Sequence, residues 1–251
     1  MKKFALILIS SVLFFTACNK NKLDCCVFPE TVTVTLKFTH NWDGTPITAT
    51  DFNDFKFTTE NGELVSIEKL RYLVSNITLD SQIKNYNLIN IGENTDLEIN
   101  FTDINQGTNN LKFTFGFADA DNTDGIYQDL NSVSFNVPEM MGGGYHFMQF
   151  DGKYKDTNNE DASFNYHAIR AVDMSDTNNL IFEDTSFEVD LGTVEITNNA
   201  IVEVKVNIAE WFKNPNTWNL NELNTVLMPN FEAQKMMSAN GKTVFSLGDI
   251  N

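Results

Sequence analysis

The sequence predicts an all-β protein, an antiparallel β-sandwich that ends in one or two short helices. Three observations support this class. Apolar and polar residues alternate over many short stretches, as expected for strands with one buried face. Asn, Asp and Gly separate these stretches, as turn residues do. The chain has 21 Phe among its 251 residues, enough to fill a sizeable core, and helical patterns come only near its end.

The first residues are typical of a secretory signal. Two lysines precede an apolar run over residues 4–15 that is too short to cross a bilayer, and Thr16-Ala17 ends it. Cys18 follows directly, as in the lipobox of bacterial lipoproteins, so we expect cleavage after residue 17 and acylation of Cys18. An ordinary signal peptide with a nearby cysteine is the alternative. Acyl chains such as palmitate would hold an outer-membrane lipoprotein in the cell envelope, on its periplasmic or surface face.

Three parts are therefore expected: a signal peptide over 1–17, a lipid-anchored tether over 18–30 and one β domain over 31–251. The formal net charge of −17 argues against a nucleic-acid partner. Cys25 and Cys26 lie just after the anchor, so the domain has no long-range disulfide framework. A vicinal disulfide and an exposed reactive pair are both open.

Strands are expected in order along the domain. In the first, at 32–40, the even-numbered residues share one face, and Asp43-Gly44 stops it. Asn61-Gly62 is a hairpin signal and Asp151-Gly152 a turn signal. Asn230 would cap a short helix that ends at Gly241, after a single helical turn at 208–213. The other expected strands are 50–60, 70–79, 86–91, 111–117, 145–150, 164–169, 187–191 and 202–208.

The three histidines of the chain, His40, His146 and His167, each lie in an aromatic, strand-like segment. The first two share a face with apolar residues, whereas the direction of His167 is ambiguous. An inward imidazole needs a partner, because an unpaired buried polar group costs on the order of 1–3 kcal/mol. The partner is either an ordinary protein group or a metal ion shared by two or three rings. Imidazole suits copper and zinc, and nearby thioethers favour copper(I). The thioethers near His146 in sequence are those of Met140, Met141 and Met148.

An acidic segment contains Asp119, Asp121 and Asp124 and ends at Gly125. In an EF-hand, acids stand at positions one, three and five, glycine at six and Glu at twelve. Here Asp124 and Gly125 each fall one place late, and Leu130 stands at the twelfth position. A weak calcium site and an ordinary polar loop both stay open.

The sequence contains no nucleophile elbow, phosphate-binding loop or zinc-protease motif, so we expect a protein that is not an enzyme.

Several segments together resemble the MbnP-like proteins, the methanobactin-associated periplasmic copper-binding family. The most specific sign is the joint presence of Leu70–Ile77, a Tyr-Leu-Val-Ser-Asn-Ile block, and Gly143–Met148, a Gly-Gly-Tyr-His-Phe-Met block. The resemblance covers nearly the whole chain after the signal. The other segments that carry it are Phe38–Gly44, Phe115–Asp119, Asp151–Tyr154 and Tyr166–His167.

The resemblance implies a β-sandwich outside the cytoplasm. Some relatives bind copper through histidines and an oxidised tryptophan (kynurenine), beside a di-haem enzyme related to bacterial cytochrome c peroxidases that performs this oxidation. In them a tryptophan is expected two residues before a ligand histidine; before His40 that place is Phe38. Trp42 is then the candidate for modification, and a weaker copper affinity is implied.

The leading hypothesis is an envelope lipoprotein that captures or stores copper through His40, His146 and His167, with Met148 as a further ligand. His40 and His146 are the preferred pair. The alternative is a non-metal interaction module that partners a di-haem peroxidase-like protein or an outer-membrane assembly. A third reading is a ligand- or glycan-binding surface lipoprotein that uses exposed aromatics such as Tyr145 and Trp218.

Overall fold

The structure is a computed structural model that describes residues 31–251. The signal peptide, the tether, Cys18 and the Cys25-Cys26 pair lie outside the described residues. Within the described part, no helix is both long enough and apolar enough to cross a membrane.

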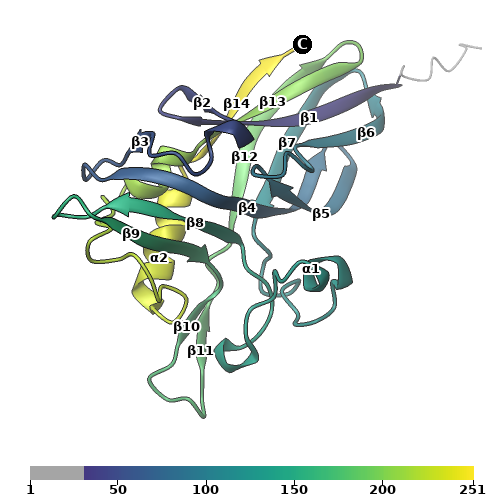
Figure 1. The fold of residues 1–251 in the computed structure, drawn as a ribbon. Helices are drawn as coiled ribbons and strands as arrows, with labels where there is room; N and C mark the ends of the chain where they lie inside the picture. Colours follow the sequence, from purple (N-terminus) through teal and green to yellow (C-terminus); the bar gives the residue numbers. More distant parts are fainter. Residues whose placement is uncertain (1–30) are drawn as a thin grey trace, which may run out of the picture.

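Two β-sheets form the body of the protein (Figure 1). One has five strands in the order β14-β13-β1-β2, with β6 also paired to β1. The other has seven, in the order β12-β7-β4-β8-β9, with β3 and β5 also paired to β4. The bounds of the first sheet are β1 (Thr31–Trp42), β2 (Thr45–Ile47), β6 (Glu98–Asn105), β13 (Ala200–Asn207) and β14 (Phe245–Ile250). Those of the second are β3 (Phe57–Thr58), β4 (Leu64–Leu79), β5 (Gln82–Asn90), β7 (Gly107–Phe115), β8 (Met148–Lys155), β9 (Asp161–Ala168) and β12 (Phe187–Ile196).

The core lies between these sheets, as the alternating pattern predicts. Phe38 of β1 packs edge-on against Phe113 of β7, with ring centroids 5.8 Å apart, and both side chains are buried. The prediction of an all-β sandwich is confirmed. One pairing differs from the antiparallel expectation, because β1 and β13 run parallel. All seven strands of the second sheet separate these two strands in sequence, so no hairpin constrains their direction.

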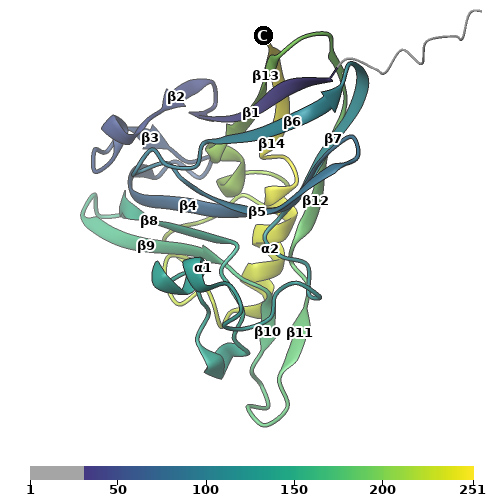
Figure 2. The ribbon, with the colours of Figure 1, turned by 90° about the vertical axis from the view of Figure 1, so that its right-hand side faces the viewer.

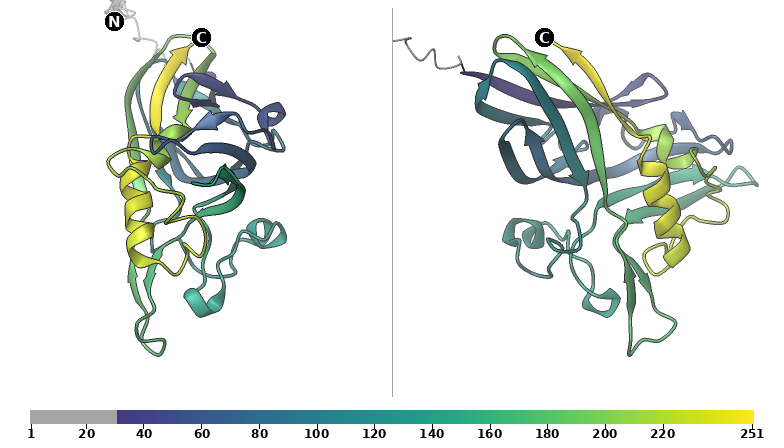
Figure 3. Two further views of the ribbon diagram at one scale, coloured as in Figure 1. Left: turned by 60° about the vertical axis from the view of Figure 1, so that its left-hand side comes forward. Right: turned by 180° about the vertical axis from the view of Figure 1, so that it is seen from behind.

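The helices near the end of the chain agree with their sequence signals. The side chain of Asn230 accepts a hydrogen bond from the N–H of Ala233 and caps α2 (Phe231–Gly241). A single turn, η3 (Ile208–Phe212), follows β13. Figure 3 shows α2 at the side of the sandwich, where it contacts η3, β9 and β10 (Ala171–Asp173).

The strand expected over 50–60 is wrong for most of its length. Residues Ala49–Asp51 form a short 3-10 helix, η1, and only β3 is extended. The Asp51 carboxylate accepts a hydrogen bond from the N–H of Thr48 at 2.8 Å and closes this turn. A local side-chain bond therefore replaces the sheet ladder here.

Two excursions leave the sandwich at the same end. The connection over residues 116–147 carries α1 (Gln128–Ser132) and η2 (Glu139–Met141), and β10 pairs with β11 (Ile181–Glu183) in a hairpin. Figures 1 and 2 show this hairpin and the α1 region projecting away from β1, β2 and β14.

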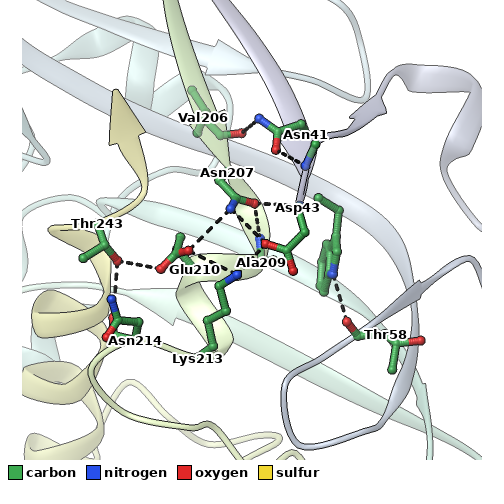
Figure 4. A network of polar contacts seen from close by, with 12 residues as sticks. Asn41, Asp43, Thr58, Val206, Asn207, Ala209, Glu210, Lys213, Asn214 and Thr243 are labelled. Carbon is green, nitrogen blue, oxygen red and sulfur yellow. Dashed lines mark hydrogen bonds and ion pairs between the residues drawn. The ribbon is translucent and has the colours of Figure 1, made fainter. Parts of the chain in front are cut away.

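A polar network ties the β1–β2 turn to η3 (Figure 4). Asn207 donates from its amide to the Asp43 carboxylate at 3.0 Å and accepts from the N–H of Asp43 at 2.9 Å. Lys213 forms ion pairs with Asp43 and with Glu210. The network anchors the end of β1 just beyond His40 and Trp42.

Candidate metal centre

Three neighbouring strands of the seven-stranded sheet divide the candidate side chains between two faces. Successive residues of a strand point to opposite faces. Tyr72 of β4 points into the core and packs against Phe115, whereas Arg71 points outward and donates to the Gln149 side chain at 2.6 Å. Likewise Tyr166 of β9 bonds the Trp211 carbonyl in the core, so His167 lies on the outer face.

His167 is held on that outer face by a carboxylate. Its Nε2 lies 2.7 Å from Oδ1 of Asp151, and both side chains are less than one-fifth exposed. Burial alone would raise the pKa of Asp151, but hydrogen bonds from His167 and Asn165 hold it well below its usual range. The carboxylate is therefore ionised and only accepts, so Nε2 of His167 carries the proton. In the neutral ring, Nδ1 then bears the lone pair.

His146 comes to the same face from the connection that precedes β8. Its Nδ1 lies 3.0 Å from the Phe135 carbonyl oxygen, which only accepts, so Nδ1 carries the proton. Nε2 bears the lone pair and, within residues 31–251, has no hydrogen-bond partner although it is buried. Burial lowers the pKa of His146 to about 4, so the ring is neutral at pH 7.

The two imidazoles are neighbours. The ring centroids of His146 and His167 are 5.2 Å apart, with the planes at 84°. In each ring one nitrogen donates to a fixed oxygen, and the other is left as a potential ligand. This is how protein carbonyls and carboxylates usually orient metal-binding histidines. The two rings that lie side by side are those of His146 and His167, whereas His40 with His146 was the pair preferred from the sequence.

The acidic segment shapes the connection that carries His146. Asn122 accepts from the N–H of Tyr145 at 2.8 Å, and Asp124 accepts from the N–H of Gly144 at 3.1 Å. Gly144 has φ +83°, and a Cβ there would lie 2.7 Å from the Asn122 side-chain oxygen. The backbone thus needs glycine to pass close to this asparagine.

His40 does not join this pair. Its Nε2 lies 2.9 Å from the hydroxyl of Tyr72, inside the sandwich, and the rings meet edge-on. Burial lowers the pKa of His40 to about 3. Because Tyr72 and His167 are on opposite faces of the seven-stranded sheet, the sheet separates His40 from the other two histidines. His40 therefore has an ordinary protein group, the Tyr72 hydroxyl, as its hydrogen-bond partner. This is the first of the two alternatives that the sequence left open for the buried histidines.

Met148 and Trp42 are also core residues. Met148 is fully buried and points to the face opposite Gln149, away from the paired imidazoles. Trp42 donates from its indole N–H to the Thr58 carbonyl at 2.9 Å and stacks on Phe57. Tyr145 and Trp218, both expected at the surface in the third reading, are fully buried.

The aspartates considered for calcium engage separate partners. Asp121 accepts from the Asn76 amide, Asp124 from a backbone N–H, and Asp119 lies 3.6 Å from Arg170. Nowhere in residues 31–251 do three or more His, Cys, Asp or Glu side chains gather as a metal-binding group. In the structure, Asn122 and Asp124 of this segment support the histidine connection through hydrogen bonds.

Sequence reasoning missed Asp151, because Asp151-Gly152 resembles a turn. In the structure both residues lie within β8, and the peptide at Gly152 passes so close to Ser66 that a Cβ would meet its carbonyl oxygen. Residues two positions apart on a strand point to the same face, so Asp151 could have been assigned to the face that carries Gln149. Its partner His167 is 16 residues away, and only strand pairing connects the two.

The histidine pair fits copper by its donor set. Imidazoles suit copper, and the buried Nε2 of His146 has no hydrogen-bond partner among the described residues. Bound copper would accept these two nitrogens as ligands. Hydrogen bonds to the Phe135 carbonyl and the Asp151 carboxylate orient the two rings.

Comparisons with known proteins agree with this architecture. A profile of the MbnP family matches residues 31–229. The solved structure of MbnP from Methylosinus trichosporium is similar, with a TM-score of 0.54 and 11% sequence identity over 87% of this chain and 99% of that one. At this identity the likeness concerns the fold. A search of curated proteins found no match. Since the family profile spans most of the sandwich, the chain belongs to the MbnP family.

Proposed function

We propose that this protein captures copper in the cell envelope, with His146 and His167 as the imidazole ligands. One observation carries the proposal: a buried imidazole nitrogen, Nε2 of His146, has a fixed lone pair and no partner within residues 31–251, beside a second imidazole. An unpaired buried polar atom costs on the order of 1–3 kcal/mol, so its retention calls for a ligand.

Two further features support copper capture. Asp151 orients His167 through Nε2 and adds negative charge next to the site, as carboxylates that support metal-bound histidines do. Because burial keeps His146 neutral down to about pH 4, the proton does not compete for its lone pair at neutral pH.

The location in the envelope rests on the first 18 residues. The signal-like run and Cys18 would place the mature chain on a lipid anchor outside the cytoplasm. The excess of acidic residues, 34 Asp and Glu against 17 Lys and Arg in the full chain, would raise the local concentration of cations around the tethered domain.

Copper(I) affinity of the purified chain tests the site, measured by competition with a chromophoric chelator under reducing conditions. The parent should carry Ser at Cys18, Cys25 and Cys26, because thiolates bind copper(I) themselves. His146→Leu and His167→Leu should each weaken the binding at this site by at least roughly 100-fold, since even supporting residues of a metal site contribute 10–100-fold.

His40→Leu is the matched control, because His40 is equally buried but already bonded to Tyr72. Its copper affinity should stay within about threefold of the parent. If His40→Leu abolishes binding while His146→Leu retains it, the assignment of the ligands is wrong. If all three variants bind as the parent does, the proposed function fails at this site.

A further inference from the structure

A pocket of about 530 Å³ opens beside His167 and is lined by an unusual share of the chain's methionines. Residues 31–251 contain seven methionines, and four of them line this pocket. They come from three separate segments: η2, the residue after β10, and the loop that precedes α2. We call this the methionine pocket, defined by Met140, Met141, Met174 and Met228, with His167 and Val226.

The donor set of the methionine pocket is soft. Thioethers select copper(I) among the biological transition metals, whereas calcium, magnesium and zinc prefer carboxylates, imidazoles or thiolates. The described residues contain no group of three His, Cys, Asp or Glu that would compete as a harder site. The space exceeds what one ion needs, but methionine has three rotatable bonds, so its sulfur atoms can move inward around an ion.

The rim of the methionine pocket is open to solvent. Met140 is 72% exposed, and Val226 is 76% exposed. Val226 also adopts φ +58°, a conformation that a β-branched residue rarely takes. The neighbouring residue, Leu227, is buried. The carbonyl oxygen of Leu227 accepts a hydrogen bond from the Gln234 side-chain amide at 3.0 Å, and this bond holds the loop in place. Held strain of this kind concentrates at binding sites.

The pocket and the imidazole pair share a wall. His167 lines the methionine pocket, and its ring also lies against the ring of His146. An ion in the pocket would therefore lie next to the imidazole ligands while remaining accessible past Met140.

We propose that the methionine pocket is a second copper(I) site, a thioether site that receives the ion from solution beside the imidazole pair. The choice of copper rests on the proposed function. The thioether ligands are a separate set, and they can be tested without the histidines.

The first test is NMR of the cysteine-free chain labelled at the methionine methyl groups, titrated with copper(I) under reducing conditions. The methyl signals of the four pocket methionines should shift, and those of Met148, Met236 and Met237 should not. Zinc prefers imidazoles to thioethers, so it should shift the pocket methionine signals much less than copper(I) does. Absence of shifts with copper(I), or equal shifts with zinc, would overturn the thioether site.

The second test measures copper(I) stoichiometry in a variant with all four pocket methionines changed to Leu. This swap nearly conserves volume, so the fold should be kept, which circular dichroism checks. The variant should bind one equivalent less than its parent. Changing Met236 and Met237 of α2 to Leu is the matched control and should lose nothing. Unchanged stoichiometry in the pocket variant would contradict the inference.

His146→Leu separates this inference from the proposed function. If that variant keeps its full copper but the pocket variant loses an equivalent, the imidazole site is wrong and the thioether site stands. The reverse result removes the thioether site alone.

Discussion

Replacement of His146 by Leu should have the opposite effect on stability from the same replacement at His40. In the metal-free protein, His146→Leu removes a buried nitrogen without a partner among the described residues, and this relief is worth about 1–3 kcal/mol. The change also removes the Nδ1 hydrogen bond to Phe135, worth about 0.5–1.5 kcal/mol. The Phe135 carbonyl still accepts from the backbone N–H of residue 146 at 2.9 Å, so it is not orphaned. The net expectation is a gain of about 1 kcal/mol.

His40→Leu leaves the Tyr72 hydroxyl without its partner in a side chain that is 1% exposed. This should destabilise the protein by about 1–3 kcal/mol. The two variants should therefore differ by about 3 kcal/mol, although both replace a buried histidine by leucine.

Urea unfolding followed by tryptophan fluorescence, with a chelator present, measures this difference. With a slope of about 2–3 kcal/mol per molar urea, the midpoints should lie about 1 M apart, with His146→Leu at the higher value. Copper should reverse the order of parent and His146→Leu, because a ligand at 100 times its Kd stabilises the parent by about 2.7 kcal/mol. Equal destabilisation of both metal-free variants would refute the reasoning, since it would mean that Nε2 of His146 has a partner.

Three other outcomes are expected. Burial lowers the pKa of His40 from 6.5 to about 3, so as the pH falls the unfolded chain binds a proton at His40 before the folded protein does. The contribution of His40 to the free energy of unfolding is therefore complete above pH 6.5, and on the order of 2 kcal/mol of it is lost by pH 5. Urea unfolding at pH 7 and 5 should show this drop in the parent and a smaller one in His40→Leu; equal drops would contradict it. Gly144→Ala should destabilise the protein by more than Gly44→Ala and should also weaken copper binding. Both residues have positive φ, but only Gly144 lacks room for a Cβ. Equal losses of stability of the two variants in thermal unfolding would show that crowding at Gly144 has no effect. Glu63→Ala should lower the free energy of unfolding in urea by about 2–3 kcal/mol, because the buried Glu63 carboxylate accepts a hydrogen bond from the N–H of Leu220 at 3.1 Å. A loss below about 0.5 kcal/mol would mean that water replaces the carboxylate as the acceptor.

Local sequence signals predicted most of the sandwich because their causes are local. Alternation from Val32 to His40 marked the buried face of β1, and Asn61-Gly62 turns the chain between β3 and β4 with φ +97° at the glycine. Asn230 caps α2 as expected. Each of these depends on residues a few positions apart, so one sequence suffices to predict them.

Signals failed where the cause lies elsewhere in the chain. Alternation does not say which strands become neighbours, so the parallel pairing of β1 with β13 was not predictable. The strands β6 and β14 have weaker alternation and were missed; both gain their order from pairing with β1 and β13.

The sequence by itself determined that this chain is an MbnP-like β-sandwich with three histidines in its strand-like segments, because turn chemistry, alternation and short motifs are encoded by adjacent residues. Only the tertiary structure decided which imidazoles meet. Strand pairing sets His167 and Asp151 on the outer face of one sheet, and a connection of about 30 residues brings His146 to them, while the same sheet keeps His40 on its other side. It also gathered four methionines from three segments into one pocket. Such meetings depend on how distant strands pack, and a one-residue change of register would turn His167 to the other face.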